Sequence, residues 1–151
     1  MNRALTETEM TDVLAEELYG HLACIMPNGR AYVVPMTYAF HDNAVYSFTY
    51  TGQKIAILRG HPAVCFQVEQ FLHEGTWSSV IVWGTYEEIP ATEHMKAIEI
   101  LTERLQREEG KATSALYNEL LPKKTGALTG KDAVFYRIRI EEKTGLHVEN
   151  D

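Results

Sequence analysis

The sequence predicts a mainly β protein, a closed or partly closed antiparallel barrel of six strands with one N-terminal helix and a long helix before the last strand. Two observations lead to this expectation. Six short runs rich in apolar, β-branched and aromatic residues follow one another with turn signals between them, which favours a meander of antiparallel strands. Several of these runs are too apolar to leave exposed as an edge, and closing the sheet removes its edges.

Length, net charge and the distribution of apolar residues limit the classes of protein to which the chain can belong. The 151 residues fit one domain, and we expect residues 1–151 to form a single one. The formal net charge of −7 argues against a nucleic-acid-binding protein, which needs a basic surface, but leaves room for one small anionic ligand. The N-terminus lacks the apolar core of a secretory signal, and no run of 18 apolar residues is present, so we expect a cytoplasmic protein without a membrane span.

The N-terminal segment predicts a short amphipathic helix over Thr8–Tyr19. Its apolar residues recur at three- and four-residue spacing, which puts them on one helical face. Thr8 or Thr11 is expected to cap this helix, and Gly20 is expected to end it. The first strand would therefore begin after Gly20.

Three strands follow, with clear turn signals between them. Leu22–Met26 and Ala31–Phe40 flank a Pro-Asn-Gly turn, which predicts a hairpin. Pro35 lies in the middle of the second run, and because proline cannot donate to a ladder, this strand must lie at an edge or bulge there. A His-Asp-Asn turn then leads to Ala44–Tyr50, which alternates as a strand.

The second half of the chain predicts three more strands. Ala63–Phe71 is apolar and follows a proline, and Trp77–Ile89 has the strongest strand pattern in the chain. Gly84, inside that pattern, indicates a bulge or the close approach of another backbone. Ala133–Ile140 alternates cleanly as the last strand and is expected to extend toward the C-terminus.

Helices are predicted between these strands. Thr92–Glu109 is a long amphipathic helix with Thr92 as its expected cap. Shorter helical segments are expected at residues 55–59 and 114–121. The apolar face of the long helix consists of Met95, Ile98, Leu101 and Leu105.

No catalytic or metal-binding motif is present. The sequence has no GxSxG elbow, HExxH pair, GxGxxG or phosphate loop, and its six histidines lack ligand spacing, so we predict no metal site. Cys24 and Cys65 lie in apolar runs without a CxxC partner, which indicates two reduced core thiols.

Two segments carry the residue types that bind phosphate. Gly52–Lys54 ends a strand just before a short helix, where backbone N–H groups and one cation can hold an anion. A solvated turn is the alternative interpretation of these residues. Trp77–Ser79 begins the next long strand with two hydroxyl groups and an indole, and an ordinary strand start is the alternative there.

Five segments stand in a specific order and spacing: Gly20–Ala23, Tyr32–Tyr38, Val45–Phe48, Gly52–Lys54 and Trp77–Gly84. Together they make the region from about Gly20 to Ile89 resemble the pyridoxamine 5′-phosphate oxidase-like superfamily of flavin-binding split barrels. Within that superfamily the chain is most similar to the nitroimidazole-resistance (Nim) proteins. The last 60 residues or so add only a closing strand to the resemblance.

The resemblance implies a six-stranded antiparallel split β-barrel of the FMN-binding type. It also implies a homodimer in which two equivalent FMN molecules lie in clefts between the subunits. The residues that the resemblance assigns to the cofactor are Val34, Pro35, Met36 and Thr37 beside the ring, Ser47, Phe48 and Thr49 along the ring and ribityl chain, and Gly52, Gln53, Lys54, Trp77, Ser78 and Ser79 toward the phosphate.

The sequence departs from the family pattern at several places. Thr49 stands where many Nim proteins have a histidine close to the ring, and Ser78 stands where an arginine is often found. The C-terminal arginine signature of true pyridoxamine-phosphate oxidases is missing, so we do not predict that activity.

These features lead to the hypothesis of an FMN-dependent oxidoreductase that reduces a small molecule with electrons from NADH or NADPH. No catalytic acid or base is assigned. One alternative is a flavin-binding module without catalysis, and another is the use of a deazaflavin. A third is a haem-binding or haem-degrading relative on the same fold, for which His147 is the candidate axial ligand in the C-terminal segment.

Overall fold

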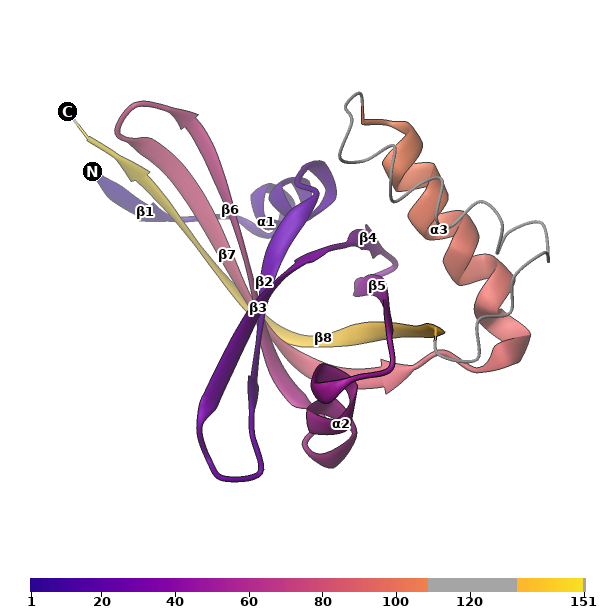
Figure 1. Cartoon of the computed structure of the whole chain (residues 1–151). Helices are drawn as coiled ribbons and strands as arrows, with labels where there is room; N and C mark the ends of the chain where they lie inside the picture. Colours follow the sequence, from indigo (N-terminus) through magenta and orange to yellow (C-terminus); the bar gives the residue numbers. More distant parts are fainter. Residues whose placement is uncertain (109–132, 151) are drawn as a thin grey trace.

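The computed structural model describes residues 1–108 and 133–150, which form one curled antiparallel sheet with helices around it (Figure 1). The strand order is β3-β2-β6-β7-β8-β5-β4, and β1 pairs with β8. The strands are β1 (Asn2–Ala4), β2 (Tyr19–Ile25), β3 (Ala31–Thr37), β4 (Ala39–His41), β5 (Ala44–Tyr50), β6 (Ala63–His73), β7 (Thr76–Glu88) and β8 (Ala133–Glu149). The helices are α1 (Glu7–Glu16), α2 (Gln53–Gly60) and α3 (His94–Gln106), with the 3₁₀ turn η1 (Ala91–Glu93) before α3.

The sheet must curl because its two ends are consecutive in the chain. β3 and β4 lie at opposite ends of the strand order, yet only Tyr38 separates them. The Tyr38 backbone N–H donates to the Leu18 carbonyl at 3.1 Å, and its buried hydroxyl donates to the Leu14 carbonyl at 2.7 Å. These bonds fix the corner at which the sheet closes on itself. The predicted mainly β, partly closed barrel is confirmed.

The described residues form eight strands rather than the predicted six. The predicted run Ala31–Phe40 is divided at Tyr38 into β3 and β4, and β1 falls outside every predicted strand. β1 and β4 are each three residues long, which is too short to give an alternating pattern. Pro35 lies in β3, an end strand, where the missing backbone N–H leaves no gap in the ladder.

The N-terminal helix begins earlier than the sequence pattern indicates. Thr6, rather than Thr8 or Thr11, caps α1. Its hydroxyl accepts a hydrogen bond from the Glu9 N–H at 3.2 Å, and the Glu9 carboxylate accepts one from the Thr6 N–H at 3.0 Å. This reciprocal capping box satisfies two backbone donors at the start of the helix.

Two glycines allow close approach inside the sheet. The register between β7 and β8 shifts between Trp83 and Gly84, and a Cβ at Gly84 would stand 2.2 Å from the Arg139 carbonyl oxygen. The predicted irregularity at Gly84 is thereby confirmed. Gly20, predicted to end the first helix, lies instead in β2, where a Cβ would stand 2.3 Å from the Phe66 ring.

The long helix starts later than predicted. Thr92 lies in η1, and α3 begins after it without a side-chain cap. Met95, which the sequence places on the apolar face, is 48% exposed, whereas Leu101 and Leu105 are buried in the cluster between α3 and the sheet. The predicted helix at 114–121 lies outside the described residues. None of the described helices is long and apolar enough to cross a membrane.

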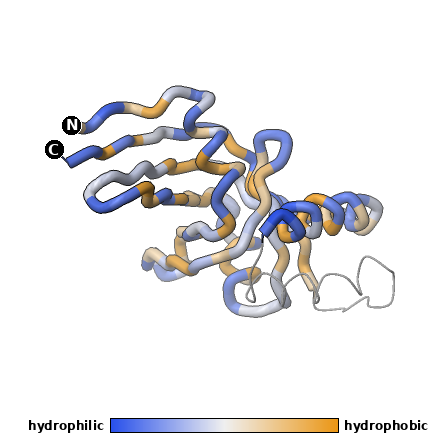
Figure 2. Tube along the Cα trace, turned by 90° about the horizontal axis from the view of Figure 1, so that it is seen from above, coloured by the Kyte–Doolittle hydropathy of each residue, from blue (hydrophilic) through white to orange (hydrophobic). Residues whose placement is uncertain are grey.

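Two apolar clusters hold the fold together. One fills the inside of the barrel, and the other lies between α3 and the strands β4 and β5. Figure 2 shows hydrophobic and hydrophilic residues interspersed along the strands, as expected for strands that bury one face. Cys24 is buried and Cys65 is half-buried, and both thiols are free. The largest fully buried side chains of the first cluster are Tyr38, Tyr136, Phe66, Leu14 and Leu22.

Candidate functional site

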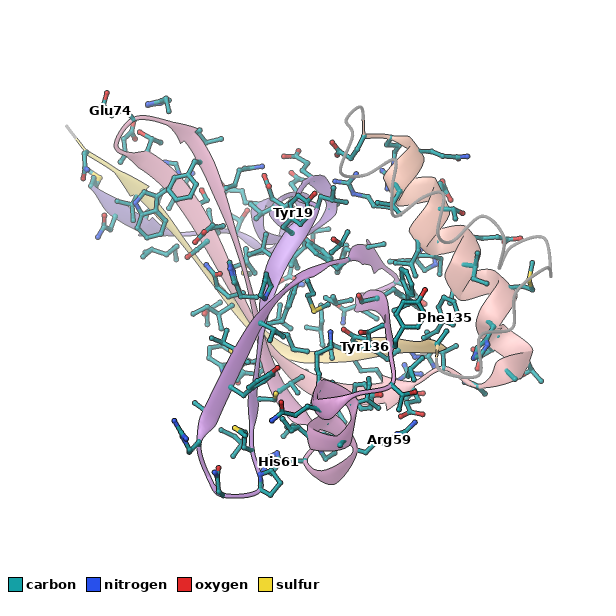
Figure 3. The ribbon with its side chains drawn as sticks, viewed as in Figure 1. Tyr19, Arg59, His61, Glu74, Phe135 and Tyr136 are labelled. Atoms are coloured by element: carbon teal, nitrogen blue, oxygen red, sulfur yellow. The ribbon has the colours of Figure 1, made fainter. Side chains whose placement is uncertain are left out.

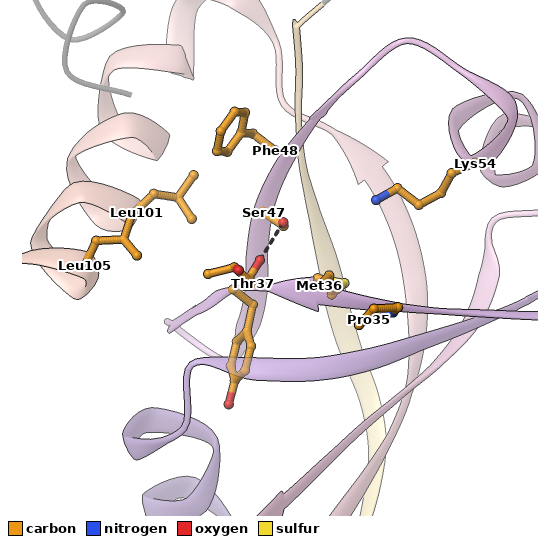
Figure 4. Close-up of a pocket in the computed structure, with 9 residues that line it drawn as sticks. Pro35, Met36, Thr37, Ser47, Phe48, Lys54, Leu101 and Leu105 are labelled. Carbon is orange, nitrogen blue, oxygen red and sulfur yellow. Dashed lines mark hydrogen bonds between the residues drawn. The ribbon is translucent and has the colours of Figure 1, made fainter. Parts of the chain in front are cut away.

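A cavity of about 200 Å³ opens at the seam, the junction of β3 with β4 and β5 at which the sheet closes (Figure 4). Its residues come from four parts of the fold: the end of β3, the middle of β5, the first turn of α2 and one face of α3. They converge because the curl brings β3 next to β5, although the two are far apart in the strand order. The lining residues are Pro35, Met36, Thr37, Tyr38, Ser47, Phe48, Lys54, Leu101 and Leu105.

Side-chain contacts across the seam keep this cavity preformed. Ser47, which is 4% exposed, donates from Oγ to the Thr37 carbonyl oxygen at 2.8 Å (Figure 4). Ser47 lies opposite Tyr136 of β8, whose hydroxyl stands 3.7 Å from the Met36 sulfur. Burial raises the pKa of Tyr136 to about 12, so this phenol stays protonated at neutral pH.

Lys54 is the charged group of the cavity. It lies in the first turn of α2 and points toward the cavity from the side opposite α3 (Figure 4). Its Nζ stands 5.8 Å from the centroid of the Tyr136 ring, and no ion pair within the described residues involves it. Burial lowers the pKa of Lys54, with a smaller opposing effect from the Cys24 thiol. A partly buried cation without a counter-ion favours an anionic ligand.

Six of the thirteen residues that the family resemblance assigns to the cofactor line this cavity, and four more are next to them in the chain. Val34 and Thr49 adjoin the lining residues in β3 and β5, and Gly52 and Gln53 form the exposed start of α2 directly before Lys54. The assigned residues that line the cavity are Pro35, Met36, Thr37, Ser47, Phe48 and Lys54.

The segment Trp77–Ser79 lies elsewhere in the same chain. It pairs with residues 146–148 of β8, whereas the cavity residue Ser47 pairs with Tyr136. About ten residues of β8, or roughly 30 Å of strand, separate the two places. Figure 3 shows this separation, with Glu74 at the β6–β7 tip and Tyr136 near the seam. Within one chain this segment does not join the cavity.

Successive side chains of β7 point to opposite faces of the sheet, so the side chains of this segment do not all lie on one face. Trp77 and Ser79 are half-buried on the outer face of the sheet, whereas Ser78 points inward and is 4% exposed. The Ser78 Oγ lies 2.9 Å from Nδ1 of His147, within hydrogen-bond distance. The His147 side chain is 14% exposed, and because Ser78 contacts Nδ1, a haem iron would have to bind Nε2, which lies 4.0 Å from the Glu149 carboxylate.

Three of the residues that line the cavity are not among the site residues predicted from the sequence. Leu101 and Leu105 have the spacing of an ordinary buried helical face, and nothing in the sequence shows that this face borders a cavity. Tyr38 directly follows the segment that the resemblance places beside the ring. This position next to the segment is the sequence feature that could have identified Tyr38 as a site residue.

The curled antiparallel sheet with a cavity of about 200 Å³ at its seam and a lysine of α2 in that cavity defines a protein of the split-barrel class. The protein family described as pyridoxamine 5′-phosphate oxidase matches residues 6–147, and the chain belongs to this family. The resemblance seen in the sequence is therefore confirmed.

Known proteins similar to this chain support the same class. A FAD-binding protein from Mesorhizobium loti has 33% sequence identity and a TM-score of 0.73, and the match covers 97% of this chain and 98% of that one. A proposed 5-nitroimidazole antibiotic resistance protein from Bacteroides thetaiotaomicron has a TM-score of 0.72 over 98% of this chain and 88% of its own, and at 15% identity it shows the fold alone. An uncharacterised protein of Rhizobium meliloti is 38% identical over 91 residues, which are 60% of this chain and 60% of that relative.

Proposed function

We propose that the chain binds FMN at the seam cavity and acts as an FMN-dependent oxidoreductase in the cytoplasm. The observation that carries the proposal is Lys54, a partly buried cation that makes no ion pair with the described residues and stands at one end of the cavity. A phosphate supplies the missing charge, and a charge-assisted contact of this kind contributes about 1.5–3 kcal/mol. Membership of the family and the FAD-binding relative from Mesorhizobium loti support the choice of a flavin.

The rest of the lining suits the flat ring of a flavin. β3 pairs only with β2 among the described strands, so the other edge of Pro35–Thr37 offers backbone groups to a ligand. Phe48 adds an apolar surface, and a flavin ring needs such a slot with polar backbone groups at its rim. We assign Pro35–Thr37 to the ring, Ser47–Thr49 to the ring and ribityl chain, and Gly52–Lys54 to the phosphate.

The chain contributes binding and orientation to the proposed reaction. Bound FMN supplies hydride and electron transfer between a nicotinamide donor and a small-molecule acceptor. Lys54 holds the phosphate, and the seam holds the ring against Met36 and Thr37. We assign no general acid or base, since the buried Tyr136 keeps its proton at neutral pH and the Ser47 hydroxyl is bonded to the Thr37 carbonyl.

The purified chain is expected to bind FMN about ten-fold or more tightly than riboflavin, because the phosphate carries the charge that Lys54 recognises and ten-fold corresponds to about 1.4 kcal/mol. Fluorescence-quenching titrations with FMN, riboflavin and FAD measure this difference. Equal affinities for FMN and riboflavin would contradict a phosphate site at Lys54, and tighter binding of FAD would make FAD the cofactor.

Anaerobic bleaching of the bound flavin by NADH or NADPH distinguishes an oxidoreductase from a module that only binds flavin.

We also propose that a second copy of the chain completes the site. The cavity of about 200 Å³ is smaller than the range of about 300–1,000 Å³ that is usual for ligand pockets. The outer face of the sheet exposes large apolar side chains, which marks an interaction surface. A two-fold dimer through this face would cover them and bring Trp77 and Ser79 of one copy toward the seam of the other. The exposed apolar residues of this outer face are Ile25, Val33, Phe71, Trp83 and Leu146.

Light scattering at micromolar concentration is expected to give twice the 17.1 kDa mass of the chain. Phe71→Lys should shift the equilibrium toward monomer with little loss of melting temperature, because Phe71 is 73% exposed. Met95→Lys is the matched control, since Met95 is also exposed but lies on α3, away from the outer face. A monomeric wild-type chain that binds FMN with full affinity would contradict the dimer.

A further inference from the structure

The two ends of the seam cavity differ in charge. Lys54 enters from α2 at one end, and Leu101 and Leu105 enter from α3 at the other (Figure 4). Leu101 and Leu105 are one helical turn apart, which places them on the same face of α3. They are 4% and 5% exposed, and Phe48 packs against their cluster while stacking on Phe135 with 5.8 Å between ring centroids. The α3 end of the cavity is therefore a fixed apolar wall.

Two polar groups near this wall already have partners. The Ser47 Oγ donates to the Thr37 carbonyl oxygen at 2.8 Å, and the Tyr38 hydroxyl donates to the Leu14 carbonyl at 2.7 Å. Among the lining residues, all of which belong to the described part of the chain, Lys54 is the one charged side chain. A charged group at the α3 end would thus find no counter-ion among these residues.

We propose that the α3 end is the substrate side of the site and that it takes an uncharged, flat and largely apolar molecule. The inference rests on the proposed function, because the FMN phosphate then occupies Lys54 and leaves no cation for the substrate. A charged group placed against Leu101 and Leu105 would lose its hydration without gaining a partner. Leu101 and Leu105 are therefore specificity-determining residues that exclude charge as well as provide contact.

Two aromatic probes of similar size test this inference: 2-naphthol, which is neutral at neutral pH, and 2-naphthoate, which is an anion. Each is titrated into protein saturated with FMN and followed by the change in flavin absorption. 2-Naphthol is expected to bind about ten-fold or more tightly than 2-naphthoate, since only the anion must be desolvated without a partner. Leu105→Ala, also saturated with FMN, is expected to bind 2-naphthol about ten-fold more weakly because apolar contact area is lost.

Ile98→Ala is the matched control for Leu105→Ala. Ile98 is 3% exposed in the same helix and the same apolar cluster, but it does not line the cavity. Ile98→Ala is expected to lower the melting temperature as Leu105→Ala does and to leave 2-naphthol binding unchanged. Leu105→Met conserves volume, so it is expected to fold and to retain 2-naphthol binding.

Two results would overturn the inference. One is equal or tighter binding of 2-naphthoate to the FMN-saturated wild-type chain. The other is an equal loss of 2-naphthol binding in Ile98→Ala and Leu105→Ala. Failure of the wild-type chain to bind FMN is a separate result, seen in the quenching titration, and it would overturn the proposed function together with this inference.

Discussion

The Lys54→Met variant is expected to bind FMN about ten- to a hundred-fold more weakly than the wild-type chain. The substitution removes a charge-assisted contact with the phosphate worth about 1.5–3 kcal/mol, and each ten-fold is about 1.4 kcal/mol. Methionine keeps an unbranched apolar stem, so packing near Tyr136 changes little. Fluorescence quenching measures the affinity, and riboflavin, which lacks the phosphate, is expected to bind both proteins equally.

The Lys54→Met variant also distinguishes an effect on FMN affinity from an effect on the stability of the fold. Because burial lowers the pKa of Lys54, its protonated form destabilises the folded apoprotein at neutral pH. This cost is complete below the folded-state pKa and disappears as the pH rises from there to the higher unfolded-state pKa. Lys54→Met removes the cost, so its apoprotein is expected to melt at the wild-type temperature or above. Lys143→Met is the control: Lys143 pairs with Glu7 outside the cavity, and FMN affinity should not change. Unchanged FMN affinity in Lys54→Met would place the phosphate elsewhere.

Gly84→Ala is expected to destabilise the fold by about 2–3 kcal/mol. A Cβ at Gly84 would stand 2.2 Å from the Arg139 carbonyl oxygen and 2.9 Å from a side-chain carbon of Ile138. Both distances are far below van der Waals contact, and the first involves backbone that cannot rotate away. β7 and β8 would have to separate at the bulge. Urea unfolding followed by tryptophan fluorescence measures the loss as a lower midpoint at unchanged slope.

Gly60→Ala is the control for this substitution. Nothing lies within 4 Å of a Cβ at Gly60, which is the last residue of α2. Its stability is expected to stay the same or to rise by about 0.4–1 kcal/mol, because alanine restricts the unfolded chain. Equal midpoints for Gly84→Ala and Gly60→Ala would show that the strands relax at the bulge without cost.

The parts of the fold that the sequence predicts well are those with a sustained pattern. Ala44–Tyr50 has the same bounds in the sequence prediction and in the structure, and β7 differs from its prediction by one residue at each end. The helix cap is missed because Thr6, Thr8 and Thr11 are all suitable residue types, and only the backbone geometry selects Thr6. The division of one predicted strand at Tyr38 depends on how the sheet closes, which no local pattern encodes.

The candidate site likewise contains some residues that the sequence predicts and others that only the structure reveals. Lys54 and Pro35–Thr37 are found from the sequence because they belong to short motifs with a fixed spacing, and the cavity brings them together. Leu101 and Leu105 are missed because their position at the cavity depends on how α3 packs on the sheet. The distance between Trp77–Ser79 and the seam is likewise set by the register along β8, which becomes visible only in the folded sheet.

The place of β8 in the sheet has a consequence for biosynthesis. β8 is the last described strand to be translated, yet it lies inside the sheet, with β7 on one side and β5 and β1 on the other. The β4–β5 hairpin therefore has no neighbouring strand to pair with until residues 133–139 of β8 have left the ribosome. A nascent chain stalled before that point presents two unmatched apolar edges, on β7 and on β5, which is the state in which strands pair with the wrong partners. Closure of the barrel thus cannot precede the translation of residues 133–139.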